Sequence, residues 1–241
     1  MINPTIIAYN LLFVICYLLF VISIRNDLTT ENAENTERDE YRTMLTDLIL
    51  LPISHSPFPI PQSFMMTKFL LTSFDTWQSH QKSNSSDDLL ARISQIKSLP
   101  YSLTFLRKLP VDAECAPNLA IAQINQLQPD TIICCGMAES RQKLTLESCA
   151  CCDTDMLKTT VNLEPLIADL ATTEISHEAG KYVCEALYYA VLKHLADSQF
   201  STKCIFVHVP ILTSENADKI VADFLLIMRR LTTRTSEKPG F

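Results

Sequence analysis

The sequence predicts an α/β fold in which a mostly parallel, doubly wound sheet carries helices on both faces, in three layers. Short apolar runs rich in β-branched residues alternate with segments whose apolar residues recur at helical spacing. The apolar runs are continuous, as in Thr131–Cys135, which is typical of strands that are covered on both sides. The chain of 241 residues is 47% hydrophobic and 20% charged, a composition that supports a well-buried core. The repeated alternation favours parallel strands joined by crossover helices.

The elements follow in order along the chain. Strands are expected at Lys68–Phe74, Tyr101–Leu109, Thr131–Cys135, Lys143–Cys152 and Cys204–Val209. Helices are expected after a cap at Ser85–Asp88, at Pro117–Leu127, at Leu163–Ala171, around Cys184 and at Asn216–Leu231. Because ligand sites in such folds lie at the carboxyl ends of strands, residues just after the strands are the first candidates for a functional site.

The amino-terminal segment predicts a membrane anchor within residues 1–25. Thr5–Ile24 contains no charged residue and has the length that a helix needs to cross a hydrocarbon core of about 30 Å. The basic residues that follow it are Arg25, Arg38 and Arg42. This bias places the rest of the chain in the cytosol, tethered to the membrane through residues 5–24.

A linker and one domain follow the anchor. Residues 26–64 are first acidic and then rich in proline, as in an extended linker, and the α/β domain is expected over residues 65–241. An alternative is a wrongly assigned start codon, in which case residues 1–64 do not belong to the functional protein.

Composition excludes several classes of function. The net charge of −7 provides no basic surface for nucleic acid, and three glycines are too few for a glycine-rich phosphate loop. The nine cysteines form an odd set that lies partly in apolar runs, which indicates buried thiols in a reducing compartment. The cluster Cys149–Cys152 lacks a second cysteine or histidine pair at ligand spacing, so no zinc site is predicted.

Cys184 is a candidate nucleophile. It follows a break at Glu178–Gly180 and stands in the first turn of a predicted helix, where free N–H groups and the helix dipole lower a thiol pKa from about 8.5. His208, at the end of the last strand, suits a general base and acid, and Glu147 suits the group that orients it. Each could instead be structural: a packed cysteine, a hydrogen-bonded histidine and an exposed glutamate on an edge strand. Their spacing alone leaves both interpretations open.

Four separated motifs decide between these interpretations. They are Leu70–Trp77 (LLTSFDTW) with Asn84 beyond it, Gly136–Arg141 (GMAESR) leading to Glu147, Ala179–Cys184 (AGKYVC), and Phe206–Pro210 (FVHVP). In content and order they are similar to motifs of one family. Residues 67–232 thereby resemble the pyroglutamyl-peptidase I (pyrrolidone-carboxylate peptidase) family of cysteine peptidases.

The resemblance implies a cysteine exopeptidase that releases an amino-terminal pyroglutamyl group through a thioester, without a metal or organic cofactor. By that resemblance Cys184 is the nucleophile, His208 the general base and acid, and Glu147 the residue that orients the histidine. The remaining matched positions are implied to form the binding pocket for a peptide or small amide: Phe74 and Trp77 around the lactam ring, with Asn84, Met137 and Arg141 shaping the site.

Departures from the family pattern concern the pocket. Met137 stands where the family has glutamine, and Glu139–Ser140 replaces a glycine pair. The stretch from Glu147 to Cys184 is also shorter than the family's, and in the family that stretch helps form the pocket wall and a subunit contact. Two alternatives therefore remain: a cysteine hydrolase for another small amide, and a non-catalytic, membrane-tethered module that keeps the fold. A homo-oligomer also remains open.

Overall fold

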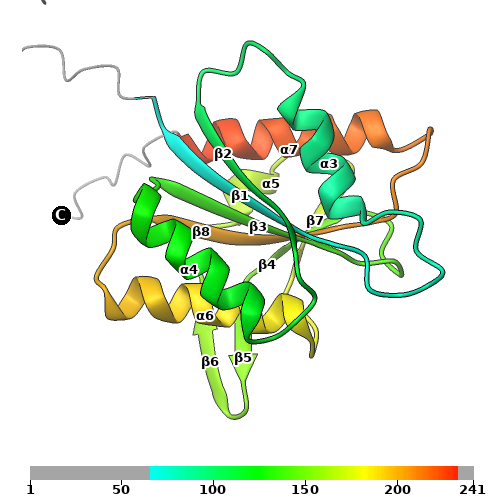
Figure 1. Cartoon of the computed structure of the whole chain (residues 1–241). Helices are drawn as coiled ribbons and strands as arrows, with labels where there is room; N and C mark the ends of the chain where they lie inside the picture. The colour runs from blue at the N-terminus through cyan, green and yellow to red at the C-terminus, as the bar shows by residue number, and fades with distance from the viewer. Residues whose placement is uncertain (1–65, 233–241) are drawn as a thin grey trace, which may run out of the picture. The chain divides into compact units, whose positions relative to one another are not determined.

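The computed structural model of the chain describes residues 66–232, which are organised by a six-stranded sheet (Figure 1). The strands of this sheet are β1 (Lys68–Phe74), β2 (Ser102–Leu109), β3 (Thr131–Met137), β4 (Leu144–Glu147), β7 (Thr173–Ser176) and β8 (Lys203–Val209). Their order is β2-β1-β3-β8-β4-β7, and every pairing is parallel except that of β4 with β8. The predicted mostly parallel α/β fold is confirmed.

Helices cover both faces of the sheet. They are α3 (Ser85–Ser94), α4 (Cys115–Leu127), α5 (Glu164–Ile167), α6 (Val183–Asp197) and α7 (Ala217–Thr232). In Figure 1, α3, α5 and α7 lie on one side of the sheet, and α4 and α6 lie on the other. Each side has its own core of buried apolar residues, as expected for a sheet between two helical layers.

The spacing of apolar residues explains which helix face is buried. In α7 the fully buried residues include Ile220, Phe224 and Ile227, and in α6 they include Leu187 and Val191. These positions recur at intervals of three and four residues, so they form one stripe along each helix. Burial of such stripes fixes α6, and with it the first turn that carries Cys184, against the sheet.

Two sequence predictions were wrong in detail. The single strand expected at Lys143–Cys152 is divided into β4 and β5 (Cys149–Cys152), and β5 forms a separate hairpin with β6 (Asp155–Lys158). The helix expected at Leu163–Ala171 is only the single turn α5. That turn ends because Ala168 has extended backbone (φ −51°, ψ 129°) and Asp169 is left-handed (φ 61°).

The predicted anchor, Thr5–Ile24, and linker, 26–64, lie outside the described residues, so they stay predictions from the sequence. Among residues 66–232, no helix is long and apolar enough to cross a membrane.

Asp87 of α3 joins three elements at the end of β1. Its carboxylate accepts a hydrogen bond of 2.8 Å from Ser73 Oγ of β1, and bonds of 2.7 and 2.8 Å from Arg107 Nε and Nη2 of β2. Burial opposes the charged carboxylate, but these donors outweigh it and hold the pKa of Asp87 below its usual value. The carboxylate therefore fixes the end of β1, where Phe74 enters the candidate site described below.

We expect Asp87→Asn to lower the free energy of unfolding by about 2 kcal/mol, because Arg107 loses a charged bidentate partner. The folded pKa of Asp87 lies below its unfolded value of about 3.9, so this contribution is present above that pH and is lost as pH falls through the folded pKa. Urea unfolding at pH 7 and at pH 3 measures it. Asp88→Asn is the matched control, since Asp88 is less buried and accepts from Ser83. Equal losses in both variants would contradict the prediction.

Candidate active site

Cys184 is the second residue of α6, as the sequence predicted. The turn before it depends on Gly180, whose φ of +96° lies in the left-handed region that favours glycine. Tyr182 then has extended backbone (φ −138°, ψ −158°) and forms the N-cap, and Ala186 N bonds to Tyr182 O. The chain thus enters α6 at an angle that presents the first turn to the carboxyl ends of the strands.

The sulfur of Cys184 lies directly over Gly136 of β3. A Cβ atom at position 136 would stand 2.6 Å from Cys184 Sγ and 2.9 Å from Phe206 Cζ, both closer than real Cβ contacts allow. Gly136 is paired in the sheet with His208 of β8. Because Gly136 has no side chain, the sulfur of Cys184 can lie close to β3, the strand that pairs with the strand of His208.

His208 is held by Glu147. The two residues lie on the antiparallel pair β8 and β4, and His208 Nδ1 lies 2.8 Å from Glu147 Oε1. His208 is 6% exposed and Glu147 is fully buried. The alternative of an exposed glutamate on an edge strand does not hold, because β4 lies between β8 and β7. With Nδ1 engaged by the carboxylate, Nε2 is the ring nitrogen left for chemistry in the pocket.

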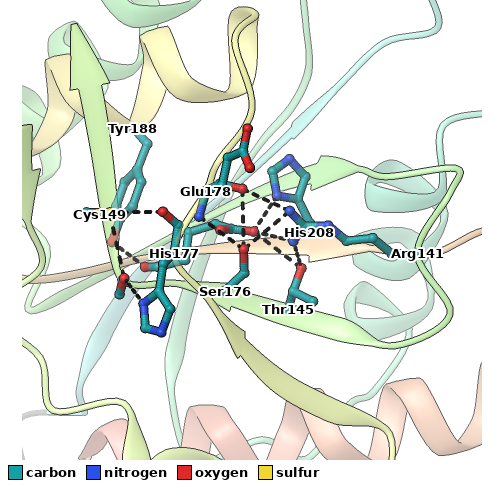
Figure 2. A network of polar contacts seen from close by, with 10 residues as sticks. Arg141, Thr145, Cys149, Ser176, His177, Glu178, Tyr188 and His208 are labelled. Carbon is teal, nitrogen blue, oxygen red and sulfur yellow. Dashed lines mark hydrogen bonds and ion pairs between the residues drawn. The ribbon is translucent and has the colours of Figure 1, made fainter.

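Arg141 also contacts the carboxylate of Glu147, and Figure 2 shows Arg141 beside His208, Thr145 and Ser176 in the same polar network. Its Nη1 contacts Glu147 Oε1 and Thr145 Oγ1, and its Nη2 donates to Glu178 O at 2.9 Å and Ser176 Oγ at 3.3 Å. The resemblance implied that Arg141 shapes the substrate pocket. The structure instead places its guanidinium between Glu147 and the loop that precedes α6.

The charge of Glu147 is set by competing effects. Burial disfavours the carboxylate, but hydrogen bonds from His208 and Ser176 and the charges of His208 and Arg141 outweigh it, so the pKa of Glu147 lies below its usual value. A permanently ionised carboxylate next to His208 stabilises the imidazolium that forms when the ring accepts a proton.

Cys184 and His208 line one pocket of about 230 Å³. Four of the five residues predicted to bind substrate line it with them: Phe74, Trp77, Asn84 and Met137. Phe74 is buried, whereas Trp77 is 52% exposed at the rim and packs against Tyr182, with ring centroids 5.1 Å apart. The pocket therefore has an apolar floor and an aromatic rim beside the nucleophile.

Asn84 has a second task in this pocket. It is the N-cap of α3, where its Oδ1 accepts from Ser86 N at 3.0 Å, and its Nδ2 donates to Asp75 O at 3.0 Å. It thus joins the loop that carries Trp77 to the start of α3, so its side chain shapes the pocket by holding this loop.

The pKa of Cys184 differs from the value expected from the sequence. Burial of the thiol, followed by the charge of Glu147, raises the pKa of Cys184 to about 12, although Arg141 acts in the opposite direction. The residue as a whole is half-buried, but the sulfur itself packs against Gly136. The expected lowering of the Cys184 pKa by the helix start is therefore wrong, because burial and the charge of Glu147 raise this pKa.

Other histidines and cysteines occupy separate places. His177 Nδ1 lies 2.8 Å from Ser148 Oγ, and His194 Nε2 lies 2.8 Å from Asn125 Oδ1, both outside the pocket lining. Across residues 66–232, no group of three or more His, Cys, Asp or Glu side chains could hold a metal ion.

Comparison with known proteins finds similarity to one family. The sequence profile of the pyroglutamyl peptidase family matches residues 161–226, which contain Cys184 and His208. Pyrrolidone-carboxylate peptidase of Brevibacillus brevis is 25% identical over 178 residues, covering 63% of this chain and 82% of the relative. That of Bacillus subtilis is 22% identical over 181 residues, covering 64% and 83%. Over these residues the chain is similar to the pyroglutamyl peptidase family.

Solved structures share the fold of this chain. Pyroglutamyl peptidase I of Bacillus amyloliquefaciens superposes with a TM-score of 0.63 at 19% identity, covering 73% of this chain and all of that one. Pyrrolidone carboxyl peptidase of Thermococcus litoralis gives a TM-score of 0.60 at 16% identity, covering 68% and 92%. At these identities the likeness concerns the fold alone.

The sequence did not predict several residues that lie at this site. Tyr182 was read only as part of a motif, yet its ring forms the rim with Trp77. Tyr188 OH donates to Glu147 O at 3.0 Å, and Thr145 and Ser176 contact Arg141. The signal for Tyr188 was its place one helical turn after Cys184, which puts both residues near the same strand ends.

The raised pKa of Cys184 gives a prediction for alkylation. At pH 7.5 we expect iodoacetamide to label the exposed Cys115 and Cys152 well before Cys184. Since the pKa of Cys184 is raised to about 12, very little of this thiol is in the thiolate form that iodoacetamide attacks at that pH. Mass spectrometry of peptides taken at successive times measures the order of labelling. The control is the same reaction in about 8 M urea, which unfolds the protein. There we expect all the cysteines to react at similar rates. Fastest labelling at Cys184 in the folded protein would contradict the prediction.

Proposed function

We propose that this chain is a cysteine peptidase that removes an amino-terminal pyroglutamyl residue through a thioester intermediate. The observation that carries the proposal is that His208, whose Nδ1 lies 2.8 Å from the Glu147 carboxylate, lines the same small pocket as Cys184. The relatives that share the family are named pyrrolidone-carboxylate peptidases, which supports the same activity here.

The first half of the reaction forms the thioester. His208 takes the proton of the Cys184 thiol as the sulfur attacks the pyroglutamyl carbonyl carbon, and the C–S bond forms while the carbonyl electrons move to oxygen. Free N–H groups in the first turn of α6 are suited to hold this oxyanion. When the intermediate collapses, the C–N bond breaks and the departing amine takes the proton from His208.

The second half releases the product. His208 deprotonates a water molecule that attacks the thioester, the C–S bond breaks, and the proton returns to Cys184 as free pyroglutamate leaves. Since the thiol begins protonated, with a pKa of about 12, the proton has to move during attack. The ionised Glu147 makes this transfer easier because it stabilises the resulting imidazolium.

The size of the pocket supports a small acyl group. Pockets for drug-sized ligands span about 300–1,000 Å³, whereas this one has about 230 Å³. A single five-membered lactam ring is compatible with that space, with Phe74 as an apolar surface against its face. The peptide beyond the scissile bond has to leave across the rim.

Hydrolysis of pyroglutamyl-aminomethylcoumarin by the purified full chain tests the proposal. We expect release of the fluorophore by the wild type and by Cys152→Ala, and none by Cys184→Ala. Cys152 is the matched control because it is an exposed free cysteine. Prolyl and alanyl derivatives of the same fluorophore test the need for the lactam. A pure, folded wild-type protein that cleaves none of them would overturn the proposal.

Met137 favours a second candidate, a cysteine hydrolase acting on another small amide. A thioether lines the pocket where the family resemblance leads one to expect an amide, and Met137 Sδ already accepts from Ser85 N at 3.4 Å. A panel of lactam and aminoacyl amides separates the two candidates, because this alternative requires faster cleavage of a substrate other than the pyroglutamyl amide.

We also propose that the enzyme acts on peptides in the cytosol. The eight cysteines of the described residues are all free, as is usual in a reducing compartment. A membrane tether through residues 5–24 and a homo-oligomer rest on the sequence and the family resemblance alone.

A further inference from the structure

A second hollow adjoins the catalytic pocket. It has about 520 Å³, against about 230 Å³ for the pocket, and the two share Lys181 and Tyr182 in their linings. We call it the α6 groove. Its walls come from the start of α4, the outer side of α6 and the hairpin β5–β6, represented by Glu114, Cys151, Glu185 and Tyr189.

The groove begins where a substrate must leave the pocket. If the pyroglutamyl ring occupies the pocket and Cys184 attacks its carbonyl, the next residue has to cross the rim. Lys181 and Tyr182 are exposed on that rim, and both also line the groove. The residues that follow Cys184 along α6 lead the same way, since Glu185, Ala186 and Tyr189 line the groove.

Specific hydrogen bonds hold the groove walls together. Tyr189 OH of α6 donates to Asp155 Oδ2 of β6 at 2.5 Å, and Cys151 N of β5 donates to Glu185 Oε1 at 3.1 Å. The first bond raises the pKa of Tyr189 to about 12. The hairpin is therefore attached to α6 at two places, and the groove has fixed walls before a peptide arrives.

The charges along the groove are mainly acidic. Its lining residues include two acidic side chains, Glu114 and Glu185, and one basic side chain, Lys181 at the rim. Asp155 of the hairpin lies next to the groove, where it accepts a hydrogen bond from Tyr189. The whole chain adds a net charge of −7. A peptide with positive side chains after its first residues is therefore attracted, and an acidic peptide is repelled.

We propose that the α6 groove binds the peptide segment that follows the pyroglutamyl residue and selects basic over acidic side chains there. This inference rests on the proposed function and names the substrate class for it, a pyroglutamyl peptide with basic residues after the scissile bond. The geometry that carries it is the shared rim of Lys181 and Tyr182, together with the carboxylates of Glu114 and Glu185.

Matched peptides test the groove in two ways. Mass spectrometry gives kcat/KM for pGlu-Ala-Lys-Lys-Ala-amide and pGlu-Ala-Glu-Glu-Ala-amide with the wild type, and pyroglutamyl-aminomethylcoumarin reports on the pocket alone. We expect the basic peptide to be favoured about fivefold at low salt, with the preference shrinking at high salt. Fluorescence anisotropy of labelled versions of the same peptides with Cys184→Ala measures binding without turnover, and a similar ratio is expected.

Charge reversal supplies the decisive variants. Glu114→Lys should abolish or invert the ratio between the two peptides, while Glu164→Lys, which reverses an exposed charge in α5, should leave it unchanged. Equal kcat/KM for the two peptides with the wild type, together with equal binding of both by Cys184→Ala, would overturn the proposed role of the groove and leave the proposed function intact. If the wild type cleaves no pyroglutamyl substrate but Cys184→Ala still binds the basic peptide selectively, the proposed function is rejected and the peptide selectivity of the groove is supported.

Discussion

Glu147→Gln is expected to lower kcat for pyroglutamyl-aminomethylcoumarin by about 10³-fold, with the protein still folded. The amide removes the negative charge that stabilises a protonated His208, and its NH₂ group can present a donor to Nδ1 where the carboxylate presents only acceptors. Arg141 simultaneously loses its ionised partner inside the site. We therefore also expect a loss of about 1–3 kcal/mol in the free energy of unfolding. Stopped assays and urea unfolding measure the two effects.

Glu174→Gln is the control for this variant. Glu174 lies on β7, next to β4, and also faces a cation, with its Oε2 at 3.5 Å from Lys143 Nζ. Both side chains of that pair are about half exposed, so its loss should cost at most about 1 kcal/mol and leave kcat unchanged. If Glu147→Gln and Glu174→Gln behave alike, the buried carboxylate has no part in catalysis.

Gly136→Ala is expected to reduce kcat by about 10²-fold through displacement of the nucleophile. The added methyl would stand 2.6 Å from Cys184 Sγ and 2.9 Å from the ring of Phe206, so the sulfur, the ring or β3 has to move. Overpacking of this kind costs about 1–3 kcal/mol of stability. Kinetics with the coumarin substrate and urea unfolding test both consequences.

Gly180→Ala provides the comparison for Gly136→Ala. A Cβ at Gly180 meets no atom within 4 Å, but the φ of +96° strains any other residue there. Gly180→Ala should therefore lose a comparable 1–3 kcal/mol, on the order of a backbone outlier, with a smaller loss of kcat. If Gly136→Ala has the kcat of the wild type, catalysis does not depend on the position of the Cys184 sulfur over β3.

Much of this arrangement could be predicted from local patterns. The apolar run Lys68–Phe74 is β1 without change, and His208 stands at the carboxyl end of β8, where a parallel sheet presents its ligand site. Four of the five residues implied for substrate binding line the pocket with Cys184. These features depend on hydrophobic periodicity and on motifs a few residues long, both of which a single sequence contains.

Features that depend on distant partners could not be predicted. Glu147 is on an alternating segment that is typical of an edge strand, but β8 and β7 flank it and bury the carboxylate. Local reasoning predicted that the helix start lowers the pKa of Cys184, whereas burial of the thiol in the folded chain and the charge of Glu147 raise it. In both cases the decisive environment comes from strands far away in the sequence.

The bond from Tyr188 OH to Glu147 O has a consequence for how the enzyme tolerates change. Tyr188 belongs to the helix that carries Cys184, and its ring also packs on Phe206, two residues before His208. The side chain of Tyr188 thus connects α6, which carries Cys184, to β4 and β8, which carry Glu147 and His208. This connection does not pass through the segment between Glu147 and Cys184, so loops within that segment can differ in length while α6 stays joined to both strands.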